Sequence, residues 1–294
     1  MILAPIKTVG VIGAGPMGNG IAQCFATAGY EVTLNDISKD ALDRAAATIE
    51  KNLYRMVARS KVGPEEMECS LQNISLTNEI DSVGGCDLVI EAATENEEVK
   101  SQIFDALGQS LEPHTILATN TSSISMTRLA RRTDRSEKFM GVHFMNLVPV
   151  IKLVELIHGI ATSKDTFESM SFTIKQLGKT IATAEDFPVF IVNRLLISMI
   201  NESVYALYEG VGGVASIDSS LKLGTNLPMG PLELGDFIGP DTCLAIMTTL
   251  HNGFSDTKYR PCPLLVKYVE AGWLGRKSGR GFYDYSSEKP VPTR

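Results

Sequence analysis

The feature that most constrains this chain is the segment VGVIGAGPMGNGIAQCFATAGYEVTLND, residues 9–36. Gly13, Gly15 and Gly18 form a G-x-G-x-x-G pattern that follows an apolar strand and opens a helix, and a second strand ends at Asp36. Such glycines allow a tight turn, the close approach of a pyrophosphate, and close packing of helix on strand. The segment therefore predicts a dinucleotide site with the pyrophosphate at a helix N-terminus.

Asp36 favours one dinucleotide over the others. Its carboxylate is expected to accept hydrogen bonds from the adenosine ribose and to repel the 2′-phosphate of NADP. NAD is therefore the expected cofactor, although Lys39 lies nearby in the sequence. FAD, which uses the same kind of loop, is the competing cofactor, but the helical pattern of the second half gives no sign of a flavin site.

Strand-like apolar runs alternate with helical segments from Lys7 to about Ala184, which is typical of a doubly wound, mostly parallel α/β sheet. Residues 37–73 are longer than a crossover needs and are expected to form a helical excursion rich in Arg and Lys. We expect a Rossmann-type NAD-binding domain over residues 1–187.

Strand patterning ends near Pro188, so residues 188–294 are expected to form an all-helical domain. Asp241 is the expected N-cap of one helix, and Gly253 and Gly272 are the expected stops of two others. This part is unusually apolar, which predicts a face buried against a second copy and hence a homodimer.

Composition limits the partners and the location. The formal net charge is −7, which argues against nucleic acid as a partner. No apolar run reaches the roughly 20 residues of a membrane span, and the chain enters a strand almost at once, so a cytoplasmic protein without a membrane partner is expected. The five cysteines form no CxxC pair and the four histidines are scattered, which predicts reduced, mostly buried thiols and no metal site.

An acid and a base lie within two apolar, strand-like segments, His143 in residues 138–144 and Glu155 in residues 151–157. Histidine suits the removal of a hydroxyl proton near neutral pH, and His143 ends a strand, where ligands of open α/β sheets bind. A lone buried carboxylate is costly, so an imidazole N–H is the expected partner of Glu155. The alternative is a glutamate on an edge strand that reaches water. The other histidines have turn or cap interpretations; they are His114, His158 and His251.

Taken together, seven motifs resemble the 3-hydroxyacyl-CoA dehydrogenase family, and most of all its short members such as 3-hydroxybutyryl-CoA dehydrogenases. They cover essentially the whole chain: IGAGPMGNGIA (12–22), DLVIEAATENEEVK (87–100), ATNTSSIS (118–125), GVHFMNLVPVIKLVELI (141–157), FIVNRLL (190–196), PMGPLELGDFIGPDT (228–242) and LGRKSGRGFYDY (274–285). The resemblance implies that a (3S)-3-hydroxyacyl-CoA, of short chain, is oxidised reversibly by NAD to the 3-ketoacyl-CoA.

The resemblance also implies roles for matching residues. His143 would be the general base with Glu155 as its partner, and Ser122, Asn193 and Asn146 would lie at the reacting group. The implied cofactor contacts are Gly13, Gly15, Met17, Gly18, Asp36, Glu95, Lys100 and Asn120. The implied substrate contacts are Ser122, Asn146 and Asn193, with Asn52 and Arg59 at CoA.

Two other functions stay open. The first is an NAD-binding structural protein, since fold does not fix function. The second is a dehydrogenase of small free β-hydroxy acids, a class that uses a lysine base, and no lysine occurs near FIVNR.

Two residues depart from the family pattern. Leu147 stands where a proline is usual, which removes a fixed φ beside Asn146. Val189 stands where a glycine is usual, and is expected to exclude a positive φ at the domain joint, close to Asn193. Both departures are expected to narrow or reshape the acyl site.

Overall fold

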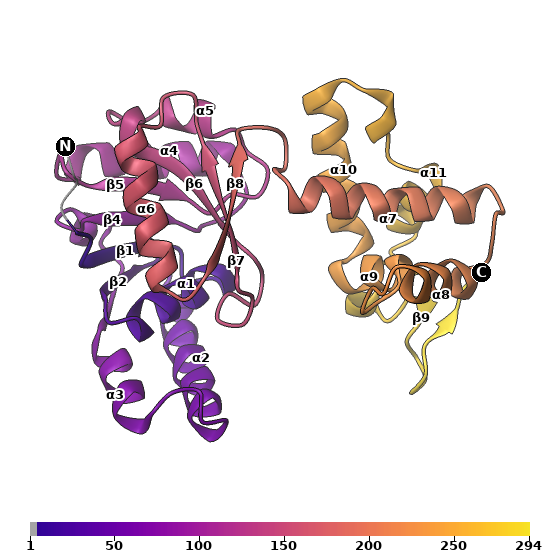
Figure 1. Ribbon diagram of the computed structural model, residues 1–294, viewed down its shortest axis with the longest axis horizontal. Helices are drawn as coiled ribbons and strands as arrows, with labels where there is room; N and C mark the ends of the chain where they lie inside the picture. Colours follow the sequence, from indigo (N-terminus) through magenta and orange to yellow (C-terminus); the bar gives the residue numbers. More distant parts are fainter. Residues whose placement is uncertain (1–4) are drawn as a thin grey trace. The chain divides into compact units, whose positions relative to one another are not determined.

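The computed structural model describes residues 5–294 (Figure 1). The chain divides into two compact units, with the boundary between Phe187 and Pro188. Each unit has its own buried apolar core.

The first unit is built on one eight-stranded sheet with the order β3-β2-β1-β4-β5-β6-β7-β8. The strands are β1 (Thr8–Ile12), β2 (Glu31–Asn35), β3 (Ile74–Thr77), β4 (Leu88–Glu91), β5 (Ile116–Thr119), β6 (Phe139–Phe144), β7 (Leu153–His158) and β8 (Thr180–Glu185). The first six strands are parallel, whereas β7 runs antiparallel to β6 and parallel to β8. The order 3-2-1-4-5-6 is that of doubly wound dinucleotide-binding sheets, which confirms the predicted fold class.

The central strands are apolar because both faces of the sheet are covered. Every residue of β4, β5 and β6 is buried, so the period-2 alternation of a half-exposed strand is missing. Helix α1 (Pro16–Thr27) packs on β1 and β2, and α6 (Lys164–Gln176) packs on β7 and β8. The remaining crossovers contain α4 (Glu97–Ser110) and α5 (Met126–Ala130).

The long connection between β2 and β3 forms two helices that extend beyond the sheet (Figure 1). Helix α2 (Lys39–Ala58) begins where the Ser38 side chain accepts a hydrogen bond from the Ala41 amide. Helix α3 (Pro64–Gln72) restarts after Gly63, with proline in its first turn. The connection is therefore helical, as the sequence predicts.

The second unit is mainly helical. Its helices are α7 (Val192–Tyr208), α8 (Val214–Gly224), α9 (Pro231–Ile238), α10 (Pro240–Phe254) and α11 (Pro263–Glu270). It also contains a short antiparallel pair, β9 (Tyr283–Asp284) with β10 (Val291–Pro292), so the expectation of an all-helical domain needs correction. Buried Asp236 accepts hydrogen bonds from the Phe282 and Tyr283 amides and fixes this segment, and strands of two residues show no periodicity in a sequence.

Two of the three expected helix signals in this unit are wrong. The N-cap of α10 is Gly239, and Asp241 lies in the first turn, where its carboxylate pairs with Lys277 at 2.6 Å. Gly253 does not end α10, which continues to Phe254; a Cβ at Gly253 would lie 2.6 Å from Pro188 Cγ, so close packing explains the glycine. Gly272, with φ 72° after α11, is confirmed as a stop.

The chain enters the second unit in an unusual conformation. Val189 and Phe190 have φ angles of 56° and 59°, so the expectation that valine excludes a positive φ is wrong. The left-handed conformation costs about 1–2 kcal/mol per residue. Both side chains are buried, and Val189 belongs to the core of the second unit. Full burial of such a side chain contributes about 1.5–3 kcal/mol, which offsets the strain.

Candidate active site

The glycine loop after β1 has the geometry that its three glycines predict. Gly13 has φ 102° and makes the turn. A Cβ on Gly18 would lie 1.7 Å from the Gly13 carbonyl oxygen, so only glycine allows α1 to start this close to β1. A Cβ on Gly15 would meet nothing within 4 Å, so this backbone is open to a ligand.

A cleft of about 750 Å³ opens at the carboxyl ends of β1 and β4, where the strand order reverses. Its lining includes Gly13, Gly15, Met17 and Asp36, four of the expected cofactor residues. The position is the topological switch point where doubly wound sheets bind nucleotides, and the volume is that of a small-molecule site. The open backbone at Gly15 and the acid at the cleft wall fit NAD.

Asp36 is held in place by backbone amides. Its Oδ2 accepts a hydrogen bond from the Ala14 amide at 2.7 Å, and its Oδ1 accepts one from the Ser38 amide at 2.9 Å. Asp36 therefore couples the glycine loop to the start of α2. Each carboxylate oxygen keeps a further lone pair for a ribose hydroxyl.

His143 and Glu155 are direct partners across the antiparallel pair β6·β7. His143 Nδ1 lies 2.7 Å from Glu155 Oε2, and the two residues are 7% and 0% exposed. The alternative of an edge glutamate reaching water is wrong, because β7 lies between β6 and β8. A carboxylate only accepts hydrogen bonds, so Nδ1 donates and Nε2 is the basic nitrogen of the ring. The pair can therefore take up and return a proton at the carboxyl end of β6.

Asn120 connects two strand ends beside this pair. It follows β5, and its amide donates to the Glu91 carbonyl at 2.7 Å. Its side-chain Oδ1 accepts a hydrogen bond from the Phe144 amide at 2.9 Å, next to His143. Asn120 thus fixes the end of β6 relative to the ends of β4 and β5.

The loop after β6 adopts a backbone conformation that depends on Leu147. Leu147 has φ 63°, which proline is unable to adopt. The Leu147 amide donates to Asn146 Oδ1 at 2.8 Å, and the Leu147 carbonyl accepts from the Val150 and Ile151 amides at 2.7 and 3.0 Å. An N–H that proline lacks therefore fixes the Asn146 side chain, and the amide nitrogen Nδ2 is the end left to face a ligand.

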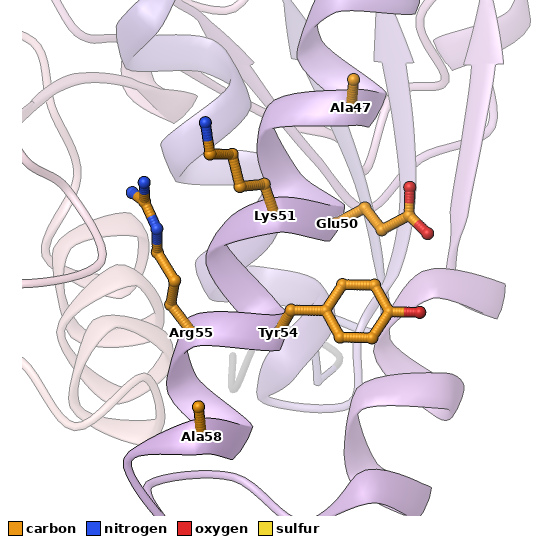
Figure 2. Close-up of a pocket in the computed structure, with 6 residues that line it drawn as sticks. All are labelled: Ala47, Glu50, Lys51, Tyr54, Arg55 and Ala58. Carbon is orange, nitrogen blue, oxygen red and sulfur yellow. The ribbon is translucent and has the colours of Figure 1, made fainter.

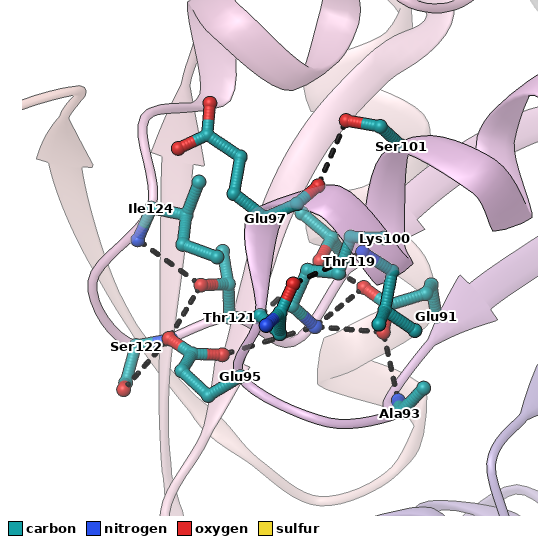
Figure 3. Close-up of polar contacts among 12 residues, drawn as sticks. Glu91, Ala93, Glu95, Glu97, Lys100, Ser101, Thr119, Thr121, Ser122 and Ile124 are labelled. Atoms are coloured by element: carbon teal, nitrogen blue, oxygen red, sulfur yellow. Dashed lines mark hydrogen bonds and ion pairs between the residues drawn. The ribbon is translucent and has the colours of Figure 1, made fainter.

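The segment after β5 is gathered around Glu95 (Figure 3). Glu95 Oε1 accepts hydrogen bonds from the Ser122 amide at 2.9 Å and from the hydroxyls of Thr121, Ser122 and Ser123 at 2.6, 3.1 and 2.7 Å. Burial raises the pKa of this carboxyl, but the hydrogen bonds and the charge of Lys100 outweigh it and leave the pKa below its usual value. Glu95 is therefore ionised and holds Ser122 at the sheet edge.

Lys100, expected at the cofactor, has its ammonium buried against Glu91 (Figure 3). Lys100 Nζ lies 2.7 and 2.8 Å from the two Glu91 oxygens and 3.8 Å from Glu95 Oε2. It is 1% exposed, so its direct partners are these two carboxylates. The sequence analysis missed Glu91, although an acid that closes an apolar strand was a signal for it.

The other expected residues belong to α2, its C-cap and α7. Asn52 on α2 donates through Nδ2 to Gln23 Oε1 at 3.2 Å, and Arg59 is the exposed C-cap of α2. Asn193 lies in the first turn of α7, in the second unit.

Residues 5–294, which the structure describes, include no group of three or more His, Cys, Asp or Glu side chains able to hold a metal ion. Within the same range, no helix has both the length and the apolar composition needed to cross a membrane.

Comparison with known proteins decides the family. Residues 8–187 match the NAD binding domain of 3-hydroxyacyl-CoA dehydrogenase, and residues 190–285 match the C-terminal domain of 3-hydroxyacyl-CoA dehydrogenase. The chain belongs to the 3-hydroxyacyl-CoA dehydrogenase family. The expected cofactor, NAD, is that of the family's first domain.

Members of the 3-hydroxyacyl-CoA dehydrogenase family match the chain over nearly its whole length. A 3-hydroxybutyryl-CoA dehydrogenase from Bradyrhizobium diazoefficiens is 60% identical over 291 residues, 99% of each chain. A probable 3-hydroxybutyryl-CoA dehydrogenase from Bacillus subtilis is 48% identical and covers 96% of this chain and 99% of its own. The crystal structure of (S)-3-hydroxybutyryl-CoA dehydrogenase from Ralstonia eutropha has a TM-score of 0.94 at 46% identity, covering 96% of this chain and 100% of that one.

Proposed function

We propose that the protein oxidises short (3S)-3-hydroxyacyl-CoA esters, with 3-hydroxybutyryl-CoA as the main substrate, to 3-ketoacyl-CoA in a reversible reaction with NAD. The observation that carries the proposal is the buried pair His143–Glu155, placed at the same sheet edge as the glycine-loop cleft. The names of the similar enzymes support the choice of substrate.

In this proposal His143 Nε2 removes the proton of the substrate hydroxyl. Glu155 accepts the Nδ1–H, fixes the tautomer and stabilises the imidazolium that forms. NAD, when bound, supplies the hydride acceptor. In the reverse direction the His143 imidazolium returns the proton to the oxygen.

Ser122 and Asn193 are proposed to hydrogen-bond the same oxygen. The Ser122 hydroxyl has one proton, and it donates that proton to Glu95 at 3.1 Å. Three shorter hydrogen bonds reach the same carboxylate oxygen, so the Ser122 proton can turn to the substrate without leaving Glu95 unsatisfied.

Helix α2 offers a surface for CoA. Its exposed basic residues Arg44, Lys51, Arg55 and Arg59 fall on one stripe at helical spacing. Figure 2 shows Lys51 and Arg55 extending to the same side of the helix. Both line a surface hollow of about 420 Å³, together with Tyr54 and Glu50. Guanidinium and ammonium groups suit the phosphates of CoA, in a chain whose net charge is −7.

The first test measures kcat/KM for the reduction of 3-ketoacyl-CoA substrates with chains from C4 to C16, with NADH and with NADPH. We expect the highest value for C4 with NADH, because Asp36 repels the 2′-phosphate. Activity on free 3-hydroxybutyrate without activity on its CoA ester would select the alternative class. Cofactor binding without turnover of any acyl-CoA would select the structural protein.

The second test reverses charge on α2 with the double variant Lys51→Glu/Arg55→Glu. We expect KM for acyl-CoA to rise about tenfold, corresponding to about 1.4 kcal/mol, while kcat stays near the wild-type value. Lys164→Glu, an exposed lysine on α6, is the matched control and should leave KM unchanged. An equal KM in the double variant and the control would remove α2 from the substrate site.

The homodimer and the cytoplasmic location stay predictions. Large apolar side chains are exposed on the second unit, among them Leu195, Val211 and Leu223, which supports a second copy as partner. Light scattering that gives the mass of one chain would overturn the dimer.

A further inference from the structure

We propose that Glu91 is a positioning residue for the nicotinamide end of the cleft: it fixes Lys100, and through Lys100 it orders Glu95 and the segment that carries Ser122. The inference rests on the proposed function, because that function places Ser122 at the reacting oxygen.

Glu91 is fully buried at the end of β4, and protein donors surround its carboxylate (Figure 3). Lys100 Nζ donates to both oxygens at 2.7 and 2.8 Å. The Thr119 hydroxyl donates to Oε2 at 2.6 Å, and the Ala93 amide donates to Oε1 at 2.7 Å. Glu91 therefore joins the ends of β4 and β5 to the first turn of α4.

Lys100 lies between two carboxylates. It is 1% exposed and bonded to Glu91, yet its Nζ is also 3.8 Å from Glu95 Oε2. Glu95 in turn holds the Ser122 amide and hydroxyl. Ala92, Ala93 and Thr94, which lie between Glu91 and Glu95 in the chain, line the cleft, so the network adjoins the cleft wall. Asp36 and the glycine loop are proposed to hold the adenosine and the pyrophosphate, so we assign the network to the nicotinamide half of the dinucleotide. Its order decides how well the nicotinamide half is held.

Stability alone is a weak reason for such a network. A buried ion pair is replaced by apolar residues of similar volume without loss in many proteins, whereas removal of one partner is strongly destabilising. What an apolar pair is unable to supply is a fixed positive charge beside Glu95. Burial raises the pKa of Glu95, but the hydrogen bond from Thr121 and the charge of Lys100 lower it below its usual value. The Lys100 ammonium lies 3.8 Å from the Glu95 carboxylate, so the pair has a role beside the cleft that an apolar pair would lose.

The test replaces both partners together, with Glu91→Met/Lys100→Met. We expect a folded protein with a lower Tm, because the Thr119 hydroxyl and the Ala93 amide lose their acceptor. We expect the Kd for NADH, measured by fluorescence titration without acyl-CoA, to rise about tenfold, and kcat/KM to fall at least as much. ADP-ribose, which lacks the nicotinamide ring, should bind within twofold of the wild type.

Two single substitutions, at the last residue of β5 and at the residue before its first, test whether the hydrogen bond to Glu91 matters for cofactor binding. Thr119→Val removes one hydrogen bond to Glu91, and Thr115→Val removes one buried bond to the Cys86 carbonyl at the other end of β5. We expect both to lower Tm, and only Thr119→Val to weaken NADH binding. Unchanged NADH affinity in the double variant, or equal weakening of NADH and ADP-ribose, overturns the proposal. Because this readout needs no acyl-CoA, it stays valid even if the protein turns over none.

Discussion

Two buried glutamates lie in the same sheet, one at the end of β4 and one in β7, and they have different partners. Glu91 and Glu155 are both 0% exposed, and each faces a basic partner, Lys100 or His143. Glu91 receives two bonds from an ammonium, one from a hydroxyl and one from an amide. Glu155 faces an imidazole directly opposite it across the strand pair.

The partner decides what each pair can do. The Lys100 ammonium lies 2.7 and 2.8 Å from the two Glu91 oxygens, so this pair ties the end of β4 to α4. The His143 ring carries a basic nitrogen, Nε2, besides the Nδ1 that faces Glu155, so this pair has the chemistry to exchange a proton with a ligand. Burial of a carboxylate is therefore no sign of catalysis by itself; the basic group beside it carries that information.

His143→Gln removes the base of the His143–Glu155 pair and has the largest expected effect. We expect kcat to fall by about 10³–10⁴, because a positioned general base is lost. Steady-state kinetics measures this, and circular dichroism checks the fold. His114→Gln, at an exposed histidine beside Asp87, is the matched control and should keep the wild-type rate. Equal rates in wild type and His143→Gln would rule out the assignment.

Glu155→Gln tests whether the two acids really differ. We expect kcat to fall by about 10²–10³, less than for His143→Gln, because the base remains but its imidazolium loses a carboxylate. Glu91→Gln should instead lower Tm more than Glu155→Gln does, since it leaves a buried ammonium without its anion. Steady-state kinetics compares kcat of Glu155→Gln with that of His143→Gln, and thermal melts compare the Tm of Glu91→Gln with that of Glu155→Gln. A reversal of either ranking would refute the comparison.

Asp236 is a buried acid whose carboxylate accepts hydrogen bonds from two backbone amides and from Tyr285. Burial, together with the charge of Asp218, raises its pKa to about 6 despite those bonds. The folded state then keeps a proton that the unfolded state loses above pH 4, so this contribution to stability falls as pH rises from about 4 to 6 and is constant above. We expect the change to be about 2–3 kcal/mol.

The measurement for Asp236 compares the Tm of wild type and Asp236→Asn between pH 4 and pH 7. The wild type should lose several degrees relative to the variant over this range. Carboxyl groups with lowered pKa values, such as Glu95, act in the opposite direction in both proteins and cancel in the difference. Parallel curves would contradict the raised pKa.

Substitution of Leu147 has the smallest expected effect. It tests the loop between β6 and β7, the strands that carry His143 and Glu155. Leu147→Gly keeps the amide that holds Asn146 and relieves a left-handed conformation worth about 1–2 kcal/mol, which the added freedom of glycine offsets in part. We expect a gain in stability below about 1 kcal/mol and kcat/KM within about twofold of the wild type. Leu147→Pro removes both the amide and the conformation, and should lower kcat/KM about fivefold. A fully active proline variant would show that Asn146 needs no such support.

The fold and the centre of the site were predictable because both depend on local, periodic signals. The glycine loop needs only a strand, a turn and a helix in succession, and its acid follows at the end of the next strand. His143 and Glu155 were predictable because each interrupts an apolar strand, and because a buried charge demands a partner.

The rest depends on contacts that no local pattern encodes. Lys100 is expected from the sequence at the cofactor, and only the packing of α4 shows that its ammonium is bonded to Glu91. The positive φ angles of Leu147 and Val189 oppose their intrinsic preferences and are set by tertiary packing and by hydrogen bonds. Gly253 reads as a helix stop, yet it serves the approach of Pro188, which lies far away in the sequence.

The register of β6 with β7 has a consequence for how this enzyme can change. His143 faces Glu155 because of the ladder between the strands, not because of the length of the connection over residues 145–152. Residues can be inserted into or deleted from that connection without parting the pair, whereas a single insertion inside either strand would turn one partner to the opposite face. The loop is thus a segment whose length and sequence evolution or an engineer can vary while the contact between His143 and Glu155 is kept.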